Sequence, residues 1–190
     1  MSVFDKMVPS LLSREGGEKF TNNPADKGGP TRWGVTAAKL GEYRKLGRPA
    51  TADEVKNLGR DEAVALYRAD FWQRPGFESV STLSERIAEE LFDTGVNMGV
   101  GTPGPWLQRA LNAMNHQGRD YPDMVVDGQI GPLTCSALRN LIKLRGQADA
   151  EEVVLKVLNG FQVVRYIELA EKRGPNEEFV FGWLKNRVGL

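Results

Sequence analysis

Residues 3–17 have the sequence VFDKMVPSLLSREGG, and this stretch decides how the fold begins. Its apolar residues recur every three or four positions up to Leu12, which predicts an amphipathic helix that Pro9 bends or delays. Gly16 and Gly17 follow Glu15 directly, and glycine is the usual stop at a helix C-terminus. The sequence therefore predicts that the first helix ends at Glu15.

This predicted position suits Glu15 to acid catalysis. The negative end of the helix dipole opposes ionisation of a nearby carboxyl group, and partial burial would add to that effect. Both effects raise the pKa, as required of an acid that keeps its proton near neutral pH. The alternative interpretation is an ordinary surface glutamate near a helix end.

Residues 16–33 are rich in Gly, Asn, Pro, Asp and Thr, which predicts a long loop or a small hairpin. Long loops in compact domains are often functional. A loop that folds back over the first helix would bring Asp26 and Thr31 near Glu15. A second carboxylate and a hydroxyl are the minimum equipment for glycoside hydrolysis, although both residue types are also common turn formers.

The remaining chain predicts helices separated by breaker clusters. We expect these helices over residues 36–46, 51–67 with a break near Gly59, 84–98, 106–114, 133–144, 149 onward, and after Asn176. Residues 71–76 predict an aromatic turn, and Trp183 is expected in the core. The predicted fold class is mainly α, with a small β-hairpin or loop region after the first helix. We expect one domain over residues 1–190, which can divide into lobes of residues 1–100 and 101–190.

Composition excludes several classes of function. Lys plus Arg and Asp plus Glu both number 25, so the net charge is zero and gives no basic excess for nucleic-acid binding. His116 is the only histidine and Cys135 the only cysteine, which leaves no zinc site built from them. No signal-peptide core opens the chain, and no uncharged run approaches the ~20 residues that span a bilayer. We therefore expect no metal, no cofactor and no stable membrane insertion, and the carboxylates remain as candidate catalytic groups.

Five motifs occur in order along the chain. The first combines residues 14–17, REGG, with residues 26–36, DKGGPTRWGVT. The others are residues 66–72, 91–99, 127–134 and 182–188, with the sequences LYRADFW, LFDTGVNMG, DGQIGPLT and GWLKNRV. Together they resemble glycoside hydrolase family 108, the N-acetylmuramidases of phage endolysins and bacterial relatives. Residues 127–134 are also similar to a motif of peptidoglycan-binding modules.

The resemblance implies a lysozyme-like fold in which Glu15 is the catalytic acid, with Asp26 and Thr31 as its partners on a small hairpin. The loop between Glu15 and Asp26 is two residues longer than the family's common form, which leaves the register of Asp26 open. The substrate-binding residues expected on this basis are Gly28, Gly29, Trp33, Asp93 and Asn97. The last two stand one turn apart on one helical face, where they would line the cleft, orient Glu15 or tie the helix to a neighbouring loop.

The implied reaction is hydrolysis of the β-1,4 bond between N-acetylmuramic acid and N-acetylglucosamine in bacterial peptidoglycan, in the service of cell lysis. Inversion and retention at the anomeric carbon both stay open. A lytic transglycosylase and a non-catalytic peptidoglycan-binding scaffold are the alternatives. The resemblance further implies a monomeric endolysin, made in the host cytoplasm and released through holin pores to the cell wall and periplasm.

Overall fold

The computed structural model describes residues 1–22, 28–172 and 174–189. Ten α-helices and one two-stranded antiparallel sheet form its regular structure, which confirms the mainly α fold class. The chain divides into two compact units, Met1–Trp72 and Gln73–Leu190.

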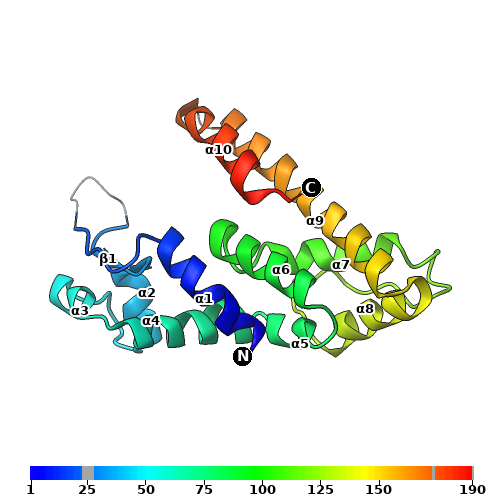
Figure 1. Cartoon of the computed structure of the whole chain (residues 1–190), viewed down its shortest axis with the longest axis horizontal. Helices are drawn as coiled ribbons and strands as arrows, with labels where there is room; N and C mark the ends of the chain where they lie inside the picture. The colour runs from blue at the N-terminus through cyan, green and yellow to red at the C-terminus, as the bar shows by residue number, and fades with distance from the viewer. Residues whose placement is uncertain (23–27, 173, 190) are drawn as a thin grey trace. The chain divides into compact units, whose positions relative to one another are not determined.

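The first unit holds one long helix, the small sheet and a series of short helices (Figure 1). In chain order these are α1 (Val3–Arg14), β1 (Thr31–Arg32), β2 (Val35–Thr36), α2 (Ala37–Tyr43), α3 (Ala52–Lys56), α4 (Arg60–Tyr67) and the π-helix η1 (Arg68–Gln73). A capping box opens α3, because the side chains of Thr51 and Glu54 each accept the other residue's backbone N–H. The break predicted near Gly59 is also confirmed, since Gly59 is the N-cap of α4.

The core of the first unit forms around the buried face of α1, where Phe4 packs on Trp72 with ring centroids 5.9 Å apart. The prediction of an aromatic turn over residues 71–76 is partly wrong. Residues 71–73 are helical, because the helix continues through Gln73 as η1. A π-helix has a wider turn than an α-helix. Across the start of this turn the rings of Tyr67 and Phe71 pack together, with centroids 5.2 Å apart.

In the described part of the second unit, all regular secondary structure is helical. It contains α5 (Phe77–Ser81), α6 (Glu85–Met98), α7 (Pro103–Ala113), α8 (Pro132–Arg145), α9 (Gln147–Lys172), the 3-10 turn η2 (Gly174–Asn176) and α10 (Glu177–Arg187). The long helix α9 contacts α6, α7, α8 and α10, so it is the axis on which this unit is assembled (Figure 1).

Two details of the second unit differ from the sequence-based expectation. Helix α7 begins three residues early, at Pro103, because proline fits the first turn of a helix where its missing N–H costs nothing. Trp183 is half-buried, and the expectation of a core position is wrong. No residue of α10 is fully buried, and Trp183 instead stacks on Tyr166 of α9 with ring centroids 5.2 Å apart.

Candidate functional site

Glu15 ends the first helix, as predicted. It is the C-cap of α1, and its N–H donates to the Leu11 carbonyl at 3.0 Å. Gly16 and Gly17 follow with φ of +91° and +59°, values that glycine adopts without the steric cost of a Cβ. The Gly17 N–H donates to the Leu12 carbonyl at 2.8 Å, which is the bond that closes a Schellman motif. The two glycines therefore stop the helix and turn the chain away from the Glu15 side chain.

The predicted small sheet is a tight hairpin made of β1 and β2. Arg32 pairs with Val35 across a two-residue loop, Trp33-Gly34, whose φ values are +56° and +74°. Two successive positive φ values are those of a type I′ turn, which matches the natural twist of a hairpin. The Trp33 N–H donates to the Gly17 carbonyl at 3.0 Å, so the turn is attached directly to the end of α1.

Gly34 is the point at which Glu15 approaches the hairpin. A Cβ built on Gly34 would lie 2.6 Å from the Glu15 Cβ and 3.2 Å from its Oε2. It would also lie 2.6 Å from the Tyr67 hydroxyl oxygen. Non-bonded carbon atoms do not approach so closely, so only glycine leaves room here for both side chains. The carboxyl group of Glu15 and the hydroxyl of Tyr67 thus converge on one backbone position.

The hydroxyl of Tyr67 is fixed in this place. It donates to the Trp33 carbonyl at 3.1 Å, and the Tyr67 side chain is buried. Burial raises the pKa of the Tyr67 hydroxyl, and the nearby negative charge of Glu15 raises it further. Tyr67 therefore stays protonated beside Glu15 and acts as a hydrogen-bond donor.

Further contacts hold the hairpin rigidly in the first unit. The Trp33 indole N–H donates to the Leu58 carbonyl at 3.2 Å. The Arg32 guanidinium donates to the Glu18 carbonyl at 3.1 Å and to the Glu18 carboxylate at 2.9 Å, and it also bonds the Lys56 carbonyl of α3. Arg32 and Trp33 thus connect the hairpin to two other segments, which preorganises the surroundings of Glu15.

The other residues predicted on this loop lie along the approach to the hairpin. Thr31 is half-buried in β1, where its hydroxyl donates to the Gly29 carbonyl at 3.0 Å and its backbone pairs with Thr21. Gly29 has a φ of +65°, and Gly28 is exposed in a turn. Asp26 lies outside the described residues. Trp33 occupies the hairpin turn next to Gly34, against which Glu15 lies, and Thr31 belongs to the same hairpin. The role of each residue stays a prediction.

Asp93 and Asn97 belong to α6 in the second unit. Asp93 faces Arg187 of α10 at 3.6 Å, and the Asn97 amide donates to the Tyr166 hydroxyl of α9. Both residues thus connect helices within their own unit, and their predicted part in substrate binding stays a prediction.

One turn before Asp93, burial raises the pKa of Glu90 to about 7, and the charge of Asp93 adds to the increase. The Thr94 hydroxyl donates to Glu90 at 3.2 Å and accepts from the Gln162 amide at 3.3 Å. This chain of polar groups joins α6 to α9 inside the second unit.

Residues 127–134, a loop that continues into the first turn of α8, enclose the side chain of Gln108 on α7. The Gln108 amide donates to Asp127 at 2.8 Å and to the Gln129 carbonyl at 3.1 Å, and its carbonyl accepts the Gly128 N–H at 2.8 Å. Gln108 is buried. A buried amide requires such partners, so the motif seats a loop on α7 and satisfies this side chain.

Within residues 1–22, 28–172 and 174–189, no group of three or more His, Cys, Asp or Glu side chains is arranged to hold a metal ion. No helix in the same residues is both long and apolar enough to cross a membrane.

Sequence reasoning missed Gly34 and Tyr67 as members of this site. The pattern TRWGVT contains a usable signal for Gly34, because a glycine between two short β-branched runs is typical of a hairpin turn. Tyr67 carries no such signal, since an aromatic residue at helical spacing is ordinarily core.

Comparison with known proteins shows a shared fold and two family matches. The structure of Brucella abortus SagA has the same fold, with a TM-score of 0.65 and 22% sequence identity over 97% of this chain and 88% of that chain. No curated protein matches the chain. Residues 8–99 match the family described as Glycosyl hydrolase 108, a region that contains Glu15 and the hairpin and extends through α6. Residues 102–188 match a family described as a Predicted Peptidoglycan domain. Residues 8–99 thus belong to glycosyl hydrolase family 108, and the two matches together support a peptidoglycan hydrolase.

Proposed function

We propose that this chain is an N-acetylmuramidase that hydrolyses the β-1,4 bond between N-acetylmuramic acid and N-acetylglucosamine, with Glu15 as the general acid. The observation that carries the proposal is the convergence of Glu15 and Tyr67 on Gly34, in the region that matches the hydrolase family. Glycosidases of this kind need one carboxylic acid that protonates the leaving oxygen.

The surroundings of Glu15 support the acid role in two ways. Its position at the C-terminus of α1 sets it against the negative end of the helix dipole, which disfavours loss of its proton. The Tyr67 hydroxyl donates to the Trp33 carbonyl and so fixes the hairpin turn at Gly34, beside which the Glu15 side chain lies. A fixed acid loses little free energy to reorganisation during the reaction.

Asp26 and Thr31 are the proposed partners of Glu15. A second carboxylate either activates water or stabilises the positive charge that develops on the sugar ring. Asp26 is the carboxylate of the loop that leads into β1, and Thr31 would orient the water. The anomeric configuration of the first product distinguishes the two uses of the carboxylate, since inversion indicates activated water.

The biological role proposed is that of an endolysin, which is stored in the host cytoplasm and reaches the wall through holin pores. This part of the proposal depends on the family resemblance. Lysis that requires co-expression of a pore-forming protein supports it, and export of the chain alone contradicts it.

The test of the reaction is digestion of purified peptidoglycan by the wild type and by Glu15→Gln, with mass analysis of the products. We expect reducing muropeptides from the wild type and at least a hundredfold loss in the variant, which corresponds to about 2.7 kcal/mol of transition-state stabilisation. Asp61→Asn is the matched control, because Asp61 is an acidic residue of the same unit with a fully exposed side chain.

Each other outcome overturns part of the proposal. Equal rates for a folded Glu15→Gln variant and the wild type remove Glu15 from the acid role. Products with a 1,6-anhydro ring identify a lytic transglycosylase. Binding to the wall without any release of sugar identifies a scaffold.

A further inference from the structure

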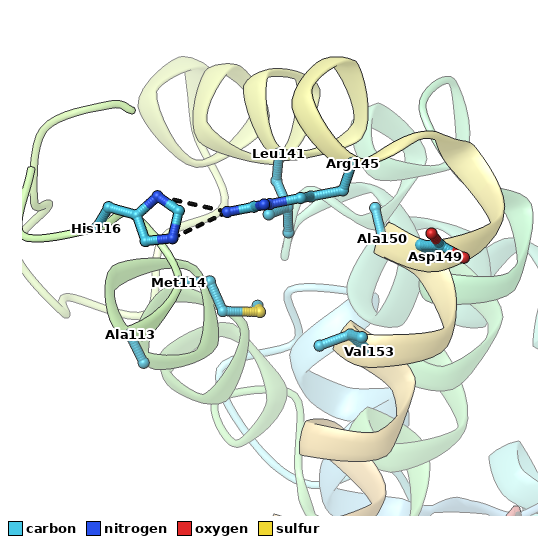
Figure 2. A pocket seen from close by; sticks show the side chains of 8 residues that line it. All are labelled: Ala113, Met114, His116, Leu141, Arg145, Asp149, Ala150 and Val153. Atoms are coloured by element: carbon cyan, nitrogen blue, oxygen red, sulfur yellow. Dashed lines mark hydrogen bonds between the residues drawn. The ribbon is translucent and has the colours of Figure 1, made fainter. Parts of the chain in front are cut away.

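A pocket of about 370 Å³ lies in the second unit, far along the chain from Glu15. It forms where the end of α7, the end of α8 and the beginning of α9 meet, within the region that matches the peptidoglycan domain (Figure 2). Its lining consists of Ala113, Met114, His116, Leu141, Arg145, Asp149, Ala150 and Val153. Volumes of this size are typical of sites for small ligands.

The walls of the pocket are aliphatic. Met114, Leu141, Ala150 and Val153 surround the space below Arg145 in Figure 2. Val153 keeps 44% of its surface exposed, so one wall of the pocket is an accessible apolar side chain. No Phe, Tyr or Trp is among the lining residues. Sugar rings bind to the flat faces of aromatic side chains, so this lining favours an aliphatic ligand over a glycan.

The guanidinium of Arg145 is held at the edge of the pocket by a chain of hydrogen bonds. His116 Nδ1 lies 2.7 Å from the Asp120 carboxylate, and His116 Nε2 lies 3.0 Å from Arg145 Nη2 (Figure 2). Arg145 Nη2 also lies 3.4 Å from His116 Nδ1, so the guanidinium approaches both nitrogens of the ring. The same Nη2 lies 3.8 Å from Asp120. Both contacts involve Nη2, which carries two of the five N–H groups, so the N–H groups of Nε and Nη1 can bind a carboxylate.

The lining carries two opposite charges. Arg145 ends α8, and Asp149 lies in the first turn of α9, so the cation and the anion are four residues apart across the junction. An isolated carboxylate ligand would be attracted by Arg145 and repelled by Asp149 and Asp120. A ligand with an ammonium and a carboxylate on one carbon satisfies Arg145 and Asp149 together.

We propose that this pocket binds the free amino-carboxylate end of the diamino acid in an uncrosslinked peptide of peptidoglycan. The carboxylate would pair with Arg145, the ammonium with Asp149, and the methylene chain would lie against Leu141 and Val153. Diaminopimelate has such an end, whereas lysine at the same position has an ammonium alone. The inference rests on the proposed function, because it takes the cell wall as the ligand, and it adds a selection between wall types.

The test is an NMR titration of the full chain with two tripeptides, L-Ala-γ-D-Glu-meso-diaminopimelate and L-Ala-γ-D-Glu-L-Lys. They differ in the terminal carboxylate alone. We expect the first to bind at least tenfold more tightly, about 1.4 kcal/mol, and to shift the resonances of Val153 and Ala150. Arg145→Ala should abolish this preference, while Arg139→Ala, an exposed arginine on the same helix, should retain it.

Equal affinities of the wild type for the two tripeptides overturn the proposal, whether or not Arg145→Ala folds. The proposal also fails if Arg139→Ala loses the preference to the same extent, or if a chitin tetrasaccharide displaces the tripeptide from the pocket. Neither tripeptide contains a glycosidic bond. Binding is therefore read independently of hydrolysis by Glu15, and the two proposals can fail separately.

Discussion

Gly34 in the first unit and Gly104 in the second are both positions where a Cβ does not fit, but different groups occupy the space. At Gly34 the neighbours are two polar side chains, Glu15 and Tyr67. At Gly104 the neighbour is backbone, since a Cβ there would lie 2.3 Å from the Gly128 carbonyl oxygen. The close approach at Gly34 thus brings two side chains together, whereas the close approach at Gly104 seats a loop on a helix.

The largest effect is expected from Gly34→Ala. The new methyl group must displace Glu15 or the Tyr67 hydroxyl, and a φ of +74° costs a non-glycine residue about 1–2 kcal/mol. We expect at least a hundredfold loss of muropeptide release, about 2.7 kcal/mol, together with lower thermal stability. Gly47→Ala is the control, because Gly47 has a φ of +69° and open space around it. Equal activity of the two variants would show that Gly34 contributes only through its backbone.

In the second unit, Gln108→Ala is expected to change stability and leave the acid chemistry intact. The substitution removes the partners of Asp127 and of the Gly128 N–H, so the unfolding free energy should fall by about 2–3 kcal/mol. Denaturant unfolding measures this loss. Gln129→Ala is the control, because the Gln129 side chain is exposed. A stable Gln108→Ala protein with reduced hydrolysis would remove the distinction between the two regions.

A pH effect of the order of 2 kcal/mol is expected from Glu90. Its pKa is about 7 in the folded chain and 4.5 ordinarily, so the folded state binds the extra proton between these values. The stability that this proton gives is complete below about pH 4.5 and is lost as the pH rises through 7. The thermal stability of the wild type should therefore fall from pH 5 to pH 8, relative to that of Glu90→Gln. Parallel profiles for the two proteins would contradict the buried position of Glu90.

The smallest effect is expected from Tyr67→Phe. The variant keeps the buried ring and removes the hydroxyl beside Glu15, so kcat should fall about tenfold, or ~1.4 kcal/mol, with little change in KM. The pH dependence of kcat should also shift, since a neighbour of the acid has been removed. Tyr43→Phe is the comparison within the same unit. An unchanged pH profile would reduce Tyr67 to a packing role.

Local signals predicted most of the fold and the position of Glu15 at the end of α1. Glycines at 16 and 17 fix the end of α1, and the Thr51 capping box fixes the start of α3, because both act within a few residues. Local signals do not predict the burial of Trp183, because its exposure depends on how much surface α9 offers to α10. The contribution of Tyr67 was not predictable for the same reason. Its hydroxyl meets Glu15 across 52 positions of sequence, and no periodicity encodes that distance.

The tryptophans give each unit its own optical probe. Trp33 and Trp72 belong to the first unit, and Trp106 and Trp183 belong to the second. Trp72 is fully buried, whereas Trp183 is half-buried in a stack with Tyr166 and Phe179. Their emission should therefore differ in wavelength and in quenching by solutes. Variants that retain tryptophans in one unit alone make the loss of each core visible separately, so fluorescence can report whether the chain melts in one transition or in two.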